Sequence, residues 1–160
     1  MKLPESTEWV LHAATALAQL AQFDQGSTAS AAQLAEHYDL PAAYLAKQLQ
    51  ALVRAGVLSG STGPRGGFRL ARPADQITLL QVVEAVDGES PFYTCREIRQ
   101  RGRGAVPPEQ CREACGLAAL MAAAEAAWRA SLAATTIADV VAALPPGLPG
   151  RTRSLLARPR

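Results

Sequence analysis

The three cysteines are the residues whose types and spacing could do chemistry. Cys111 and Cys115 stand four apart in the stretch PPEQCREAC, and Cys95 lies sixteen residues before them. A small, odd number of thiols in a reducing compartment favours metal ligands or redox groups over a disulfide framework. Residues 1–20 carry acids and a histidine where a secretory signal needs a basic head and an apolar segment, so we expect a cytoplasmic protein. The plain alternative for each cysteine is a buried, inert thiol.

Cys111 and Cys115 can reach one site in two ways. If the long helix expected beyond them begins near residue 111, they share one helix face at i and i+4. If the helix begins later, they bracket its first turn. The spacing CxxxC is a weak motif by itself, so its chemistry depends on what else lies nearby.

A carboxylate and an imidazole are expected on one face of the first helix. Successive helical residues turn by about 100°, which places Glu8 beside His12 and opposite the apolar Val10 and Leu17. Such a pair can hold a metal from one helix face. The plain interpretation is a first-turn acid favoured by the helix dipole and a surface imidazole.

A local basic patch predicts a nucleic-acid partner. The net charge of +2 is too small for the whole surface to attract nucleic acid. Residues 41–72 nevertheless contain no Asp or Glu and carry five cations: Lys47, Arg54, Arg65, Arg69 and Arg72.

The elements around this patch predict a winged helix-turn-helix. Two short amphipathic helices, over 30–38 and 41–55, are joined by a tight turn, and the second is expected to enter a major groove of double-stranded DNA. Its free face carries Tyr44, Lys47, Gln48 and Arg54. Residues 57–73 follow as a β-hairpin with Arg65 in a tip rich in Gly, Ser and Pro.

We therefore expect a mainly α fold with a small β-hairpin wing. Residues 1–88 form the winged helix-turn-helix domain, and 89–112 form a loop that bears the cysteines. Residues 113–144 form a long helix with an apolar stripe, which needs a partner surface, and a short final helix. Residues 145–160, rich in Pro, Gly and Arg, are expected to be a flexible tail. No uninterrupted apolar stretch reaches the roughly 18 residues of a membrane span.

The chain resembles the Rrf2 family of transcription regulators, which includes IscR, NsrR and RsrR, and is most similar to the RsrR branch. The resemblance covers roughly residues 1–144 and rests on the cysteine-bearing loop and four stretches: YLAKQLQALVRAGVL at 44–58, GPRGGFRLARP at 63–73, ITLLQVVEAVDG at 77–88 and WRASLAATTIADVV at 128–141. It implies a homodimeric, DNA-binding repressor whose long helices cross at the dimer interface, with an iron-sulfur cluster beside them. The implied operator is palindromic.

The resemblance also implies a ligand set. Many relatives hold a cluster with three cysteines from the loop, but here Cys95 lies far from the other two. The RsrR-like pattern is a 2Fe-2S cluster that senses redox state, held by Cys111 and Cys115 of one subunit and by Glu8 and His12 of the other. Cys95 is then a reserve ligand or a bystander. Trp9 has a packing role, or else changes orientation with the state of the cluster.

Other functions stay open at this point. Cysteine and histidine could hold structural zinc, or the thiols could switch through a disulfide, without loss of DNA binding. An iron-sulfur electron carrier or enzyme is a further alternative, but we identify no nucleophile with a partnered base and no phosphate-binding loop, and we expect neither enzymatic activity nor a small-molecule substrate.

Overall fold

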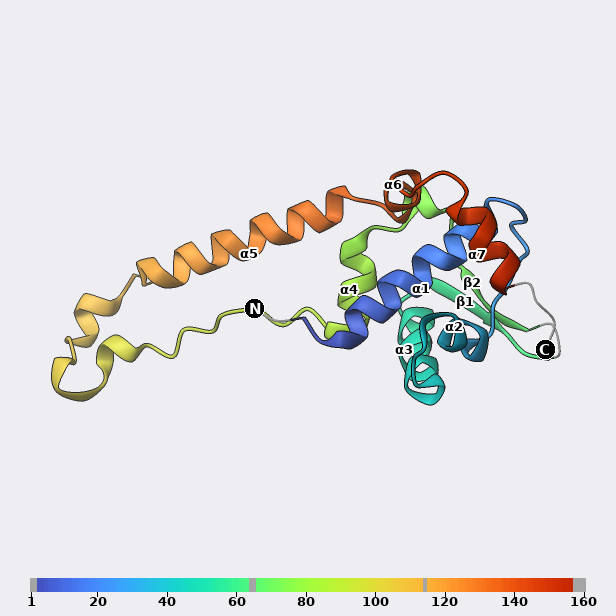
Figure 1. Ribbon diagram of the computed structural model, residues 1–160. Coiled ribbons are helices and arrows are strands. Elements are labelled where there is room, and N and C mark those ends of the chain that lie inside the picture. The colour runs from blue at the N-terminus through green and yellow to red at the C-terminus, as the bar shows by residue number, and fades with distance from the viewer. Residues whose placement is uncertain (1–2, 64–65, 114, 157–160) are drawn as a thin grey trace. The chain divides into compact units, whose positions relative to one another are not determined.

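The computed structural model describes residues 3–63, 66–113 and 115–156 (Figure 1). These residues form two compact units. One contains the described residues of 2–88 and 132–160, and the other contains those of 89–131.

The first unit is helical with a two-stranded hairpin, as the sequence predicted. In chain order its elements are α1 (Glu5–Ala21), α2 (Ala31–Tyr38), α3 (Ala42–Arg54), β1 (Leu58–Ser61), β2 (Gly67–Leu70), a short 3-10 helix (Ala74–Gln76), α4 (Leu79–Asp87), α6 (Ile137–Ala142) and α7 (Leu148–Leu156). Helices α2 and α3 form the helix-turn-helix, and the hairpin forms the wing. Figure 1 shows α1 passing among α3, α4, α7 and the hairpin.

Helix α1 is the central element of this unit. Its inner face, including Val10 and Leu17, is buried and packs against α3, α4, α6, α7 and β2. The helix begins at Glu5 after an extended Pro4. Ser6 and Thr7 are buried within its first turn.

Three helix starts carry capping boxes. In each, a hydroxyl accepts a hydrogen bond from a backbone N–H three residues on, and the side chain at that residue accepts one from the cap N–H. The pairs are Ser30 with Gln33, Thr78 with Gln81, and Thr136 with Asp139. These caps fix where α2, α4 and α6 begin.

The wing is held to the rest of the unit through its second strand, β2. Its strands pair antiparallel with Leu58 opposite Leu70 and Ser61 opposite Gly67, and Phe68 forms a further bridge with Ala29. Gly67 permits this bridge because a Cβ there would lie 2.7 Å from the carbonyl oxygen of Ala29. Arg65, expected at the tip, lies outside the described residues.

Residues 148–156 differ from the expected flexible tail. They form α7, in which Thr152 and Leu156 are buried against the rest of the unit. The amide of Gln33 in α2 donates a hydrogen bond to the carbonyl of Leu156 at 3.0 Å. Leu148, Thr152 and Leu156 are spaced four apart, so one helix face can dock despite the Pro, Gly and Arg around it.

The second unit holds the cysteine-bearing loop and most of α5 (Gly116–Ala134). The loop contains three short 3-10 helices: Ile98–Gln100, Gly102–Gly104 and Pro108–Cys111. Phe92 ties the start of the loop to α5, because its N–H donates to Glu125 at 3.1 Å and its ring meets Trp128 edge to face. Trp128 therefore packs against a residue of its own chain.

No described residue of α5 is buried, and Leu117, Leu120 and Met121 are exposed. The segment Pro108–Ala134 would pass as a membrane span by length and composition only, which is weak support for a span. Its apolar character comes mainly from alanine, and Glu125 and Arg129 interrupt it. An apolar helix face that needs a protein partner accounts for the same composition.

Candidate functional site

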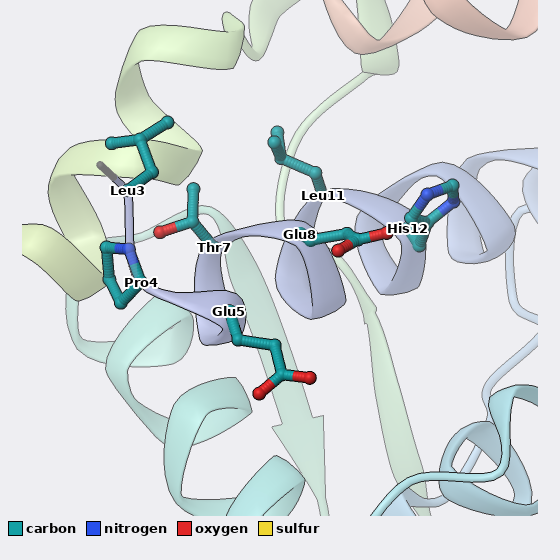
Figure 2. A pocket seen from close by; sticks show the side chains of 7 residues that line it. All are labelled: Leu3, Pro4, Glu5, Thr7, Glu8, Leu11 and His12. Carbon is teal, nitrogen blue, oxygen red and sulfur yellow. The ribbon is translucent and has the colours of Figure 1, made fainter. Parts of the chain in front are cut away.

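Glu8 and His12 line one groove on the outer side of α1. The groove has a volume of about 550 Å³ and is formed by Leu3, Pro4, Glu5, Thr7, Glu8, Leu11 and His12. Figure 2 shows the carboxylate of Glu8 and the ring of His12 following the same side of the helix, while Glu5 points away from them. Both side chains are exposed, so a metal or another molecule can reach them from outside the chain.

Thr7 adds a polar group to the same groove. It is only 1% exposed, and its hydroxyl is buried without a hydrogen-bond partner among the described residues. A buried hydroxyl without a partner is uncommon in a folded chain.

Tyr38 connects the His12 end of the groove to the helix-turn-helix. Its hydroxyl, from the last residue of α2, donates a hydrogen bond to the His12 carbonyl at 3.1 Å, and the two rings lie 5.7 Å apart. Burial raises the pKa of Tyr38 to about 12. The backbone of α1 next to a candidate ligand is therefore held directly by α2.

Trp9 connects the other side of α1 to α3, the second helix of the helix-turn-helix and its recognition helix. Its ring meets that of Tyr44, in α3, edge to face, with 5.4 Å between the ring centroids and 83° between the planes. Tyr44 keeps 47% of its surface exposed, so one side chain both contacts α1 and faces solvent. The sequence placed Tyr44 on the outer face of α3 but gave no sign of this contact, because it joins residues 35 positions apart.

The basic residues of 41–72 separate into two groups. Lys47 and Arg54 are exposed on α3, and Gln48 beside them is half-buried. Arg69 instead donates to the hydroxyl of Ser59 at 3.2 Å. Arg72 contacts the amide oxygen of Gln81 at 3.4 Å, at the start of α4. The acid-free run therefore supplies cations to the recognition helix and also braces the wing.

Cys111 and Cys115 lie just before the start of α5 rather than along it. Cys111 ends a 3-10 helix, and Cys115 directly precedes α5, where its carbonyl accepts a hydrogen bond from the N–H of Ala119 at 3.0 Å. Cys111 and Cys115 thus both precede the helix, so they neither share one of its faces nor bracket its first turn, and neither of the two arrangements expected is formed. Cys95 lies earlier in the loop. All three are half-buried, and none forms a disulfide.

Arg99 is a residue of this region that the sequence did not single out. Its guanidinium binds the carboxylate of Glu97 through two contacts, at 2.6 and 2.8 Å, and donates to the carbonyl of Glu113 at 3.2 Å. The hydrogen bond with Glu97 raises the pKa of Arg99 and lowers that of Glu97, and the nearby Cys111 and Cys115 raise the pKa of Arg99 further. Residues two apart do not face each other on a helix. The left-handed backbone of Glu97, with φ of 50°, permits the pairing.

Among the described residues of a single chain, no three His, Cys, Asp or Glu side chains gather closely enough to hold a metal. The described chain offers two partial donor sets. One is the carboxylate and imidazole of α1, and the other is the thiol pair before α5.

A helix-turn-helix with a cationic recognition helix and a hairpin wing defines a winged-helix protein of the class that reads DNA. Residues 6–143 match the Rrf2 family, described as "Iron-dependent Transcriptional regulator". The chain belongs to this family.

Individual relatives agree with this classification. The chain is 36% identical over 87 residues to the HTH-type transcriptional regulator IscR of Cereibacter sphaeroides, which covers 54% of this chain and 56% of the relative. It thus aligns with about half the length of that curated relative. The names of such relatives are those of transcriptional regulators and not of enzymes.

Solved structures share the fold. The oxidized form of Staphylococcus aureus CymR superposes with a TM-score of 0.65 at 23% identity, covering 91% of this chain and 99% of that one. T. potens IscR superposes with a TM-score of 0.63 at 18% identity, covering 92% and 95%. The winged-helix fold predicted from the sequence is confirmed.

Proposed function

We propose that the protein is a homodimeric, cytoplasmic transcriptional repressor of the RsrR branch, which senses redox state through a 2Fe-2S cluster shared between subunits. Glu8 and His12 of one subunit and Cys111 and Cys115 of the other are its ligands, with Cys95 in reserve. The observation that carries the proposal is the outward groove on α1, where Glu8 and His12 line one wall and Trp9 beside them contacts the recognition helix.

The donor set fits such a cluster chemically. Thiolates are the usual ligands of iron-sulfur clusters, and iron also accepts imidazole and carboxylate. When bound, the cluster would supply one-electron redox chemistry, and replacing thiolates on one iron raises the potential, as histidine does in Rieske centres. Within one chain, Glu8 and His12 are open to approach from outside, as a shared site requires. The exposed apolar face of α5 offers a surface for the second subunit.

DNA reading is assigned to α3. We expect the two recognition helices of the dimer to enter successive major grooves of a palindromic operator. Tyr44, Lys47 and Gln48 would face bases or phosphates, and Arg54 would add charge at the helix end. Arg65 would approach the backbone or a minor groove from the wing.

The route from cluster to DNA runs through two contacts of α1. Trp9 follows Glu8 in the chain and packs on Tyr44, which faces solvent on α3. Tyr38 joins the His12 backbone to α2. A change of charge at Glu8 and His12 would therefore reach both helices of the helix-turn-helix. Trp9 is the switch residue in this proposal, because its reorientation would move Tyr44.

The first test is anaerobic purification, with iron and sulfide analysis and an absorption spectrum before and after one-electron reduction. Gel shifts in both states, on duplexes selected from random sequence, then measure DNA binding. Equal amounts of iron and sulfide, with a spectrum that bleaches on reduction and a state-dependent shift, would support the proposal. A colourless protein that binds zinc or no metal after anaerobic purification would contradict the cluster.

A thiol switch is the second candidate. It is favoured by one observation: Cys111 and Cys115 each lie near enough to Arg99 to raise its pKa. The structural neighbour CymR is also described in an oxidized form. Mass spectrometry after mild oxidation of the metal-free protein would show a loss of two hydrogen atoms in the peptide that contains both cysteines, their two electrons passing to the oxidant. No change in DNA binding on forming that disulfide would rule this switch out.

A further inference from the structure

Arg99 stands at the centre of a small contact network in the cysteine-bearing loop. Its guanidinium donates hydrogen bonds to both carboxylate oxygens of Glu97, and one of its Nη atoms also donates to the carbonyl of Glu113. Its own carbonyl accepts from the N–H of Val106 at 2.9 Å. The side chain and backbone of one residue therefore join three parts of the loop.

The position of Glu113 makes this network relevant to the thiols. Glu113 lies two residues from Cys111 and two from Cys115, and the bond from Arg99 holds its carbonyl. The hydrogen bond with Glu97 is the largest cause of the raised pKa of Arg99, and Cys111 and Cys115 raise it further by a smaller amount. The guanidinium therefore lies within electrostatic range of both cysteines. Arg99 and Glu97 are each about one-third exposed, so solvent only partly screens their charges.

We propose that Arg99 is a positioning residue for the thiol pair and that its charge raises the reduction potential of the cluster they hold, with the Glu97 carboxylate opposing it. This inference rests on the proposed function and names two residues that tune the same site. One electron from a donor, dithionite in the test, converts one ferric ion to ferrous and breaks no bond. A neighbouring cation favours the more negative product, and a neighbouring carboxylate disfavours it.

Removing the charge of Arg99 and removing that of Glu97 should shift the midpoint potential of the cluster in opposite directions. Arg99→Gln leaves the Glu97 carboxylate unopposed and should lower the midpoint potential. Glu97→Gln leaves the guanidinium unopposed and should raise it. Arg99→Lys keeps the charge but loses the two-point contact, so it should restore most of the potential while holding the segment less firmly. Arg103→Gln removes an equal charge from an exposed position of the same loop and is the matched control.

The experiment is an anaerobic redox titration of the full-length protein and these variants, followed by visible absorption, with iron and sulfide content measured in each. Opposite shifts for Arg99→Gln and Glu97→Gln, both larger than that of Arg103→Gln, support the assignment. Shifts of the same sign, or no larger than the control, overturn it. If Arg99→Gln loses the cluster, Glu97→Gln alone decides, because it keeps the cation: a raised potential supports the assignment and an unchanged or lowered one refutes it. A wild-type protein without iron and sulfide would refute the proposed function itself, a result distinct from a cluster whose potential does not respond.

Discussion

Trp9→Leu should weaken the dependence of DNA affinity on redox state while leaving the fold intact. Leucine keeps apolar bulk on α1 but loses the edge-to-face contact with Tyr44. Such aromatic pairs contribute about 0.5–1.5 kcal/mol beyond the area they bury. If the contact forms in only one redox state, its full loss would change the ratio of oxidised to reduced affinity by roughly twofold to thirteenfold, since about 1.4 kcal/mol corresponds to a factor of ten.

Fluorescence anisotropy with a labelled operator duplex, measured anaerobically before and after reduction, gives this ratio. Phe23→Leu is the matched control, because it also removes an aromatic ring, here an exposed one just beyond the end of α1, where Phe23 contacts Arg153 rather than α3. We expect the control to keep the wild-type ratio. A Trp9→Leu protein that retains its cluster and the full wild-type ratio would show that the signal does not pass through this ring pair.

Three further predictions concern DNA binding by α3 and the stability of the fold. Lys47→Ala should weaken operator binding and reduce the slope of log affinity against log salt by about one, measured by anisotropy titration; an unchanged slope would remove Lys47 from the phosphate contacts. The pKa of Tyr38 is about 12 in the folded chain and near 10 in the unfolded chain. This difference adds to the unfolding free energy fully below pH 10, and the contribution is lost as the pH rises through about 12. Tyr38→Phe should therefore flatten the fall in unfolding free energy over that range, and should cost about 1 kcal/mol at neutral pH through the lost bond to His12; denaturant titrations at each pH test both. Gly67→Ala should cost about 1–3 kcal/mol, because its Cβ would meet the Ala29 carbonyl, whereas Gly104→Ala enters open space and should be nearly neutral in thermal unfolding.

The parts of the fold that could be predicted from sequence are those set by local rules. A hydroxyl residue followed three positions later by an amide or a carboxylate residue marks the starts of α2, α4 and α6, because a capping box needs only those two side chains and the backbone between them. The hairpin followed from apolar segments around a glycine-rich tip. Helix α7 was missed because composition pointed to a tail, while its order depends on docking Leu156 against elements more than a hundred residues earlier.

The candidate site likewise has parts that the sequence could predict and parts that it could not. Helical periodicity was enough to place Glu8 and His12 along one groove, since both lie on a single regular helix. Periodicity could not place Cys111 and Cys115, because the backbone between a 3-10 helix and α5 has no fixed repeat. The Arg99 contact depends on a left-handed residue at 97, a conformation that glutamate seldom adopts and that no local pattern predicts.

Subunit mixing tests the shared cluster most directly. One parent carries Glu8→Ala and His12→Ala, the other Cys111→Ala and Cys115→Ala, and the two carry different affinity tags so that heterodimers can be isolated before anaerobic cluster assembly. If ligands come from both subunits, each heterodimer contains one complete site and one empty of ligands, so it should hold about half the wild-type iron and sulfide while both parent homodimers hold little. Heterodimers that bind no more iron than their parents, under conditions where the wild type assembles its cluster, would contradict a site built from two subunits.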